Sequence, residues 1–190
     1  MRSSPTTLAS SLSTPPFAIL ALLVLFATPF AAWSDALRDA DLLLRAGRPV
    51  QALEQVDEYL AKQPSDMRAR FLKGVILADQ NRDNEAIDVF VRLTQDNPEY
   101  AEPYNNLAVL YAARGNLERA RAALETAVRV NPKFITAQEN LGDVYARLAV
   151  AAYGRAAALD TGSRAAREKL KLSRALVAVG KGEPGAPANR

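Results

Sequence analysis

The stretch AEPYNNLAVLYAARGNLERARAALETAVRVNP, residues 101–132, decides the fold of this chain. In its first half, Leu107, Ala108 and Tyr111 recur at the spacing that places side chains on one face of an α-helix. The second half repeats this spacing, and its apolar residues are Leu117, Ala120, Leu124, Ala127 and Val128. The stretch therefore predicts two amphipathic helices, each of which needs neighbours to bury its apolar face.

A tight turn joins the two helices. Gly115 interrupts the helical pattern, and glycine readily adopts the left-handed conformation that ends a helix. Asn116 can cap the following helix by accepting a hydrogen bond from a free backbone N–H, and Pro132 ends that helix. The stretch is therefore one complete helical hairpin.

The hairpin pattern recurs along the chain with a period of 34 residues. Ala40, Gly74 and Gly142 lie one or two periods away from Ala108. In the same way, Ala120 corresponds to Ala52 and Ala86, and Pro132 corresponds to Pro64 and Pro98. A fixed period of this length indicates an array of stacked supersecondary units. The small residues at the first two sets of positions predict that the two helices of each hairpin approach closely.

In these residues and separations the chain resembles the tetratricopeptide repeat family over Asp35 to Asp160. Asp39 and Lys73 depart from the family pattern, which usually has leucine there. The resemblance implies an all-α fold, an α-solenoid of helical hairpins. Its units would be residues 35–66, 67–100, 101–134 and a shorter fourth unit at 135–160.

The fourth unit lacks about five residues, and these are the ones that would form its turn. One long helix is therefore expected from Thr136 to Leu159, with a bend at Gly154 as the alternative. The apolar stripe of this long helix extends over its far half, which no second helix of the same unit can fold back to cover. Either the last helix covers that part or a second copy does, in a homodimer through Leu148, Ala152, Ala156 and Leu159.

The sequence predicts a final helix within residues 161–180 and a disordered polar tail over residues 181–190. We expect the final helix to cap the array with the side formed by Ala165, Leu172, Leu176 and Val179. Its basic stripe consists of Arg164, Arg167, Lys171 and Arg174. This stripe either attracts acidic lipid headgroups or an acidic partner, or is simply a solvated face.

Residues 1–34 differ from the rest because they contain no acidic residue and an apolar run at residues 17–26. This pattern is typical of a secretory signal peptide, with cleavage expected after Ser34 and export to the periplasm. The alternative is an uncleaved anchor that keeps the protein at the inner membrane. The chain has no cysteine, so disulfides are excluded.

The composition argues against catalysis. The chain has neither histidine nor cysteine and no glycine-rich phosphate-binding motif, so no cofactor or metal site is expected. An enzyme that uses only Asp, Glu, Lys, Tyr or Ser is the remaining alternative. The net charge of +3 divides into +1 over residues 1–34, −3 over residues 35–160 and +5 over residues 161–190. Because the repeat region is acidic and no aromatic residues accompany the basic stripe, nucleic-acid binding is not expected.

The resemblance implies a binding role, in which the first helices of the units line a concave groove for a peptide or helix. The residues that match groove positions are Arg68, Phe71, Val75, Asn105, Asn106, Val109, Glu139, Asn140 and Asp143. Core packing is the alternative role for Phe71, Val75 and Val109. The function expected is therefore a non-enzymatic scaffold or adaptor in the cell envelope, and the alternative is a membrane-anchored assembly or co-chaperone factor.

Overall fold

The computed structural model describes residues 29–180, with side chains described for residues 36–179. This part of the chain consists of eight α-helices and contains no strand, which confirms the all-α prediction. The helices are α1 (Pro29–Arg45), α2 (Pro49–Lys62), α3 (Met67–Asp79), α4 (Asp83–Asp96), α5 (Ala101–Ala113), α6 (Leu117–Val130), α7 (Ile135–Leu159) and α8 (Arg164–Gly180).

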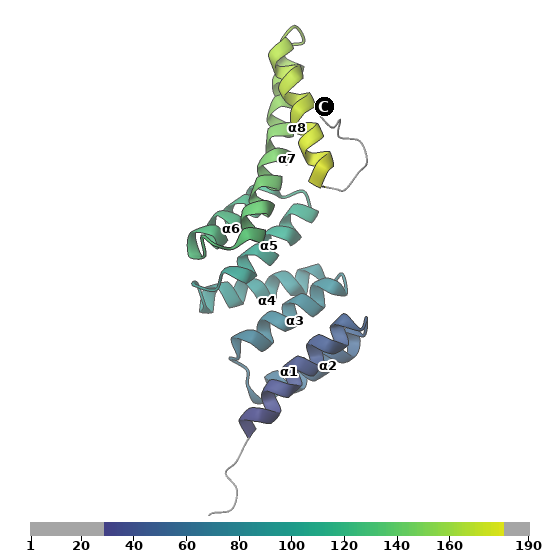
Figure 1. The fold of residues 1–190 in the computed structure, drawn as a ribbon, viewed down its shortest axis with the longest axis vertical. Helices are drawn as coiled ribbons and strands as arrows, with labels where there is room; N and C mark the ends of the chain where they lie inside the picture. The colour runs from purple at the N-terminus through teal and green to yellow at the C-terminus, as the bar shows by residue number, and fades with distance from the viewer. Residues whose placement is uncertain (1–28, 181–190) are drawn as a thin grey trace, which may run out of the picture.

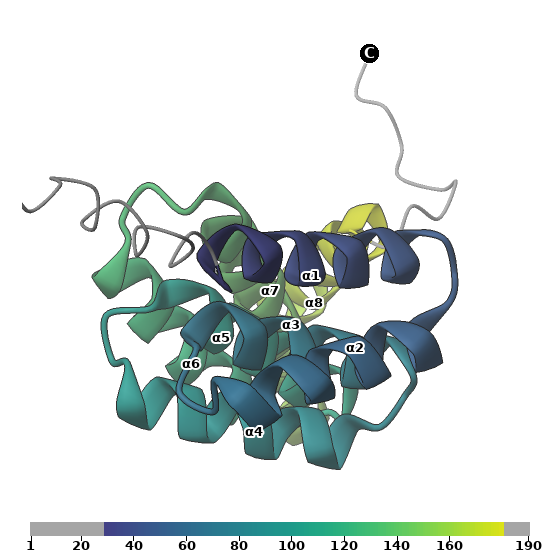
Figure 2. The same ribbon diagram turned by 90° about the horizontal axis from the view of Figure 1, so that it is seen from below.

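The first six helices form three stacked hairpins, α1–α2, α3–α4 and α5–α6 (Figure 1). The first helices α1, α3, α5 and α7 also contact one another in sequence, so they form a continuous row. Figure 2 looks along the stack and shows the hairpins lying one behind another. The expected solenoid of helical hairpins is therefore present.

The three turns inside the hairpins adopt the conformations that their residues favour. Gly47 and Gly115 have φ angles of 70° and 75°, in the left-handed region. The turn of the second hairpin has no glycine, and Asn81 takes the left-handed conformation there with a φ of 58°. Asparagine tolerates this region better than most residues because its short polar side chain can form local hydrogen bonds.

Side chains cap the first turns of α3 and α6, and the cap of α6 is the one predicted at Asn116. The Asp66 carboxylate accepts a hydrogen bond from the backbone N–H of Ala69 at 2.9 Å, at the start of α3. Asn116 accepts one from the backbone N–H of Arg119 at 3.3 Å, at the start of α6. Each cap satisfies a backbone donor that has no partner inside the helix.

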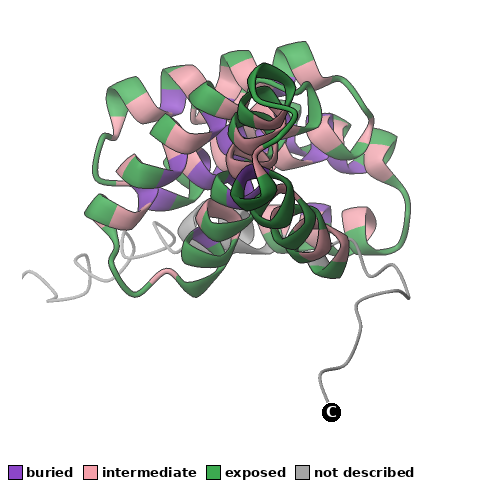
Figure 3. Cartoon of the chain, turned by 90° about the horizontal axis from the view of Figure 1, so that it is seen from above, coloured by how far each residue is buried: buried purple, intermediate pink, exposed green. Residues whose placement is uncertain are grey.

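The core follows the stack as separate clusters between neighbouring helices. Ala108 and Ala120 are buried together with Leu124 in the third cluster, as the spacing of small residues predicts. Phe90 and Leu77 occupy the second cluster. Figure 3 shows that buried residues concentrate on the helix sides that face other helices, whereas the outer sides are exposed. Each cluster therefore joins the two helices of one hairpin to a helix of the next unit.

The small-residue prediction is right at Gly74 and wrong at Gly142. A Cβ atom added at Gly74 would lie 2.5 Å from Cε1 of Phe90, so only glycine fits there. A Cβ atom at Gly142 would meet nothing within 4 Å. The reason is that no helix of the fourth unit folds back against this part of α7.

Helix α7 is continuous over 25 residues, so the long helix is confirmed and there is no break at Gly154. Its second half extends beyond the three hairpins, and α8 returns along it (Figure 1). Among the described helices, α8 contacts only α7. The last helix is therefore half of a projecting two-helix arm.

The side of α8 that packs is not the one expected. Leu172 and Leu176 are 68% and 59% exposed, and Ala165 and Val179 are exposed as well. The covered residues are instead Ala166, Leu170, Ser173 and Val177. Both sets recur at helical spacing, so periodicity alone could not decide which set packs.

Among residues 29–180, none of the helices combines the length and apolar character needed to cross a bilayer. Most of the predicted signal peptide, residues 1–28, lies outside the described residues, and α1 begins at Pro29. The predicted tail, residues 181–190, also lies outside them.

Candidate peptide-binding surface

All nine residues that match groove positions lie on three neighbouring first helices, α3, α5 and α7. We call this set the first-helix surface: Arg68, Phe71, Val75, Asn105, Asn106, Val109, Glu139, Asn140 and Asp143. Because α5 contacts both α3 and α7, residues far apart in the sequence are brought into one region.

Two asparagines form the centre of this surface. Asn140 on α7 donates a hydrogen bond from Nδ2 to Oδ1 of Asn105 on α5, with a distance of 2.8 Å. Asn105 is only 8% exposed, and Asn140 is half-buried. Among the described residues, Asn105 Nδ2 and Asn140 Oδ1 have no hydrogen-bond partner, and neither is a fully buried atom. The pair therefore presents one donor and one acceptor to solvent.

A second hydrogen bond holds α5 and α7 together. Arg147 donates from Nη2 to the backbone oxygen of Ala112 at 3.0 Å. This residue was not predicted from the sequence, although it follows Asp143 by four positions and so lies on the same side of α7. The Arg147 contact and the asparagine pair fix the relative positions of the two helices.

The apolar candidates divide into core and surface residues. The Phe71 ring lies 5.8 Å from the Phe90 ring and 5.4 Å from the Tyr100 ring, measured between centroids, and Val75 packs on the same core cluster. Core packing is thus the role of Phe71 and Val75. Val109, on α5, is 49% exposed and remains available to a ligand.

The charges of the surface differ between its two ends. Arg68 is exposed on α3, and Glu139 and Asp143 are exposed on α7. Within residues 36–179, none of the three takes part in an ion pair. The surface is therefore positive at α3 and negative at α7.

Tyr100 lies near the positive end. Burial raises the pKa of its hydroxyl, the negative charge of Glu102 raises it further, and the positive charge of Arg68 lowers it. These effects show that Arg68 and Glu102 both act on the same ring. The hydroxyl stays protonated at neutral pH and can donate a hydrogen bond.

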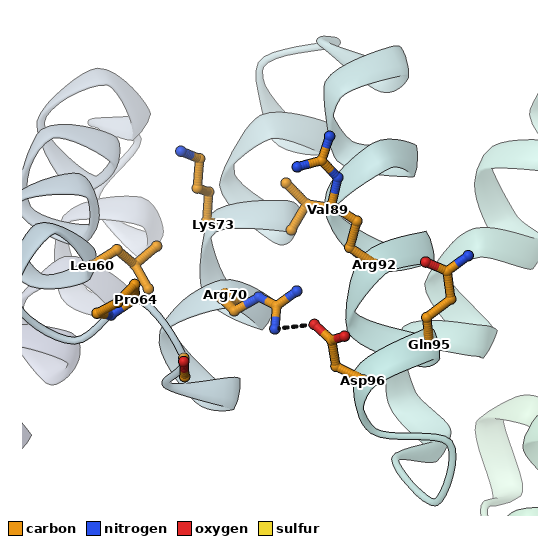
Figure 4. Close-up of a pocket in the computed structure, with 9 residues that line it drawn as sticks. Leu60, Pro64, Arg70, Lys73, Val89, Arg92, Gln95 and Asp96 are labelled. Carbon is orange, nitrogen blue, oxygen red and sulfur yellow. Dashed lines mark ion pairs between the residues drawn. The ribbon is translucent and has the colours of Figure 1, made fainter.

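The structure also contains a pocket of about 520 Å³ between the end of α2 and helices α3 and α4 (Figure 4). None of its lining residues belongs to the first-helix surface. Arg70 pairs with Asp96 at 2.7 Å, and Lys73 pairs with Asp57 at 2.7 Å. Two of the three basic residues that line the pocket are therefore already neutralised, and the pocket is not a strong anion site.

The residues predicted for dimerisation and for the basic stripe lie on the α7–α8 arm. Leu148 packs against the third core cluster, whereas Ala152, Ala156 and Leu159 are exposed. The four basic-stripe residues are all exposed: Arg164, Arg167, Lys171 and Arg174. Arg167 also donates a hydrogen bond to the backbone oxygen of Thr161. All of these residues except Leu148 are thus exposed, and none belongs to the first-helix surface.

Within residues 36–179, no group of acidic side chains is arranged to hold a metal ion. The whole chain contains no histidine or cysteine. The polar groups of the first-helix surface are suited to hydrogen bonding and charge pairing.

Comparisons with known proteins agree with this architecture. Two models of the tetratricopeptide repeat match residues 37–101 and 77–141. The chain is 32% identical over 96 residues to the chloroplastic tetratricopeptide repeat domain-containing protein PYG7 of Arabidopsis thaliana. That match covers 44% of this chain and 32% of PYG7, so this chain spans about a third of its relative.

Two solved structures have the same fold. TTC0263, a thermophilic TPR protein of Thermus thermophilus, is 26% identical with a TM-score of 0.58, and the match covers 79% of this chain and 83% of that chain. YrrB, a TPR protein with an unusual peptide-binding site, is 26% identical with a TM-score of 0.52, and the match covers 56% and 55%. Together the two repeat models span more than half of the sequence. The chain belongs to the tetratricopeptide repeat family.

Proposed function

We propose that this protein is a non-enzymatic scaffold that binds a peptide or helix of a partner protein on its first-helix surface. Tetratricopeptide repeats in general form extended binding surfaces and are not themselves catalytic. YrrB, which has the same fold at 26% identity, has a peptide-binding site. The absence of histidine and cysteine from the sequence is consistent with a binding role.

The Asn105–Asn140 pair is the observation that carries this proposal. A peptide group has one C=O acceptor and one N–H donor. Asn105 Nδ2 and Asn140 Oδ1 offer the complementary donor and acceptor from two adjacent helices. Because their mutual hydrogen bond fixes both amides, little side-chain freedom is lost on binding. An extended peptide backbone is the ligand that this pair fits best.

The charges suggest which peptide is preferred. Arg68 at one end of the surface would pair with an acidic residue of the ligand, and Glu139 and Asp143 at the other end would pair with a basic one. Val109 between them would contact an apolar side chain. The preferred ligand therefore carries opposite charges on either side of an apolar residue.

The proposed location is the periplasm or cell envelope. The apolar run at residues 17–26 and the small residues before Asp35 support export with cleavage after Ser34. In the alternative, an uncleaved segment anchors an envelope assembly or co-chaperone factor at the inner membrane. Mass spectrometry of the N-terminus separates the two, since Asp35 as first residue supports export and an intact N-terminus supports the anchor.

Homodimerisation through α7, which the sequence predicts, is an alternative use of residues that a helix of another protein could also cover. It is supported by the exposure of Ala152, Ala156 and Leu159. Light scattering combined with size-exclusion chromatography tests it, and a monomer mass at high protein concentration would rule it out.

The experiment for the main proposal is a pull-down from envelope extract with Asn140→Ala and Val109→Glu variants. Asn106→Ala, on the same helix as Val109, tests the other asparagine of the predicted set. Arg92→Ala is the matched control, because Arg92 is exposed on α4 and lies outside the first-helix surface. Loss of a partner with the first two variants and not with the control supports the proposal. Equal capture by all variants would mean that the ligand binds elsewhere.

A further inference from the structure

The α7–α8 arm, residues 148–180, leaves apolar side chains uncovered. Leu159 is 90% exposed, and Leu172 and Leu176 are exposed by more than half. Isolated exposed apolar residues are ordinary on a protein surface, whereas a continuous set of them marks an interaction site. The uncovered residues of the arm mark such a site if they lie on one side of the two helices.

The positions of the uncovered residues in α7 and α8 show that they lie on one side of the arm. On α7, exposed Ala152 and Ala156 each precede a half-buried residue, Tyr153 and Ala157. One residue corresponds to a rotation of about 100° around an α-helix, so the exposed stripe lies to one side of the packed one.

Helix α8 repeats this relationship. Leu172 and Leu176 each precede a half-buried residue, Ser173 and Val177. The two helices run antiparallel (Figure 1), and rotations of the same sense about antiparallel axes point to the same side of the pair. The two stripes therefore form one apolar face, which we call the arm face: Ala152, Ala156, Leu159, Leu172, Leu176 and Val179.

The arm face continues an interface that is already occupied lower on α7. Leu141 and Leu148 pack on the third core cluster, which contains Leu124 and Ala127 of α6. The same side of α7 continues upward through Ala152 and Ala156, beyond the reach of α6. What fits this continuation is another helix, because alanines allow a helix to approach closely and offer little side chain for insertion into a bilayer.

The arm is strongly basic. Residues 148–180 contain six basic and two acidic residues, a net charge of +4. None of the six takes part in an ion pair within residues 36–179. Lys169 lies where α7 and α8 meet, 5.6 Å from the Tyr153 ring centroid, and Arg155 directly precedes Ala156 of the arm face. The apolar face is thus surrounded by a net positive charge, and the basic residues are not paired with the two acidic residues of the arm.

We propose that the arm face binds an acidic amphipathic helix of a partner protein. The leucines and alanines receive its apolar side, and the six basic residues attract its carboxylates. A second copy of this chain fits less well, because it would bring two arms of charge +4 together. This binding mode is separate from the first-helix surface and does not depend on it.

The test uses the full chain and two synthetic helical peptides that have the same leucine stripe. The glutamate peptide has glutamate at its remaining positions, and the lysine peptide has lysine there. Fluorescence anisotropy should show that the glutamate peptide binds at least about tenfold more tightly, and that salt weakens this preference. Lys169→Glu combined with Lys171→Glu lowers the net charge of the arm from +4 to zero and should therefore abolish the preference for the glutamate peptide.

Leu176→Glu should weaken binding of the glutamate peptide about tenfold, since it places a charge in the apolar face. Val50→Glu is the matched control, because Val50 is also more than half exposed but lies on α2. Circular dichroism verifies that each variant is folded.

Four results would overturn the proposal. The first is equal affinity for both peptides, and the second is unchanged binding of the glutamate peptide by the Leu176→Glu variant. The third is a dimer mass for the unaltered chain that the Leu176→Glu substitution abolishes. The fourth is tighter binding to phosphatidylglycerol vesicles than to the glutamate peptide. The third result would identify a second copy as the occupant, and the fourth would identify an anionic membrane.

Discussion

The side chain of Asn140 donates to that of Asn105 at 2.8 Å, across two helices that belong to successive repeats. Within residues 36–179 it is the one side-chain to side-chain hydrogen bond that joins the first helices of neighbouring units. The same pair therefore links repeat stability to the surface proposed for ligand binding.

Asn140→Ala should lower the free energy of unfolding by about 1–2 kcal/mol, because it leaves the buried Oδ1 of Asn105 without a donor. Urea denaturation measures this change. Asn106→Ala is the control, since Asn106 forms no hydrogen bond with its side chain among the described residues, and its effect should stay within about 0.5 kcal/mol. Equal effects of the two substitutions would contradict a structural role for the pair.

Gly74→Ala and Gly142→Ala should have opposite effects. At Gly74 the new methyl group would lie 2.5 Å from Phe90 Cε1, and the forced displacement should cost about 1–3 kcal/mol. At Gly142 the methyl group meets nothing, so the better helix propensity of alanine should stabilise the protein by about 0.5–1 kcal/mol. Thermal melts monitored by circular dichroism compare the two, and destabilisation by Gly142→Ala would show that the site is packed.

Asp66→Ala should destabilise the protein by about 1–2 kcal/mol, because it removes the cap of α3. Asp66 also accepts a hydrogen bond from the Tyr59 hydroxyl at 2.8 Å, which ties the end of α2 to the start of α3. Asp66→Asn keeps an acceptor at the cap and should lose much less in chemical denaturation. A loss as large as that of the alanine variant would mean that the charge, and not the cap, is stabilising.

The Tyr145 hydroxyl donates to the Glu125 carboxylate at 3.0 Å, and this hydrogen bond, followed by burial, raises the pKa of Tyr145. Since the folded-state pKa lies above the unfolded value of about 10, the stabilisation is complete below about pH 10 and disappears as the pH rises through the folded-state pKa. Ultraviolet titration of tyrosine ionisation should show one fewer high-pH transition in Tyr145→Phe. In Glu125→Gln the transition should move to lower pH, and an unmoved transition would contradict the assigned cause.

Local chemistry accounts for most of what the sequence predicts correctly. The left-handed turn at Gly115 and the cap at Asn116 follow from residue type and spacing alone, and the turn at Gly47 and the cap at Asp66 have the same local causes. The long helix α7 follows from the absence of a turn signal. Each of these features depends only on residues a few positions away in the sequence, so it can be predicted without knowing the tertiary structure.

The candidate surface was predicted only in part. Matching repeat positions identified Asn105 and Asn140 as candidates, but neither their mutual hydrogen bond nor the Arg147 contact could be predicted. Both contacts span 35 residues of sequence and depend on how closely α5 and α7 approach. Phe71 also matched a surface position, and its place among two other aromatic rings became clear only in the folded protein.

The sequence by itself determined that this chain forms a row of helical hairpins, because a 34-residue period in apolar and small residues can be satisfied only by stacking equivalent units. Tertiary structure alone decided which side of α8 packs. Two apolar stripes, one through Leu170 and Val177 and one through Leu172 and Leu176, are displaced by about 100° and have the same period. The choice between them depends on the relative position of α7 and α8, and it leaves the second stripe exposed on the arm.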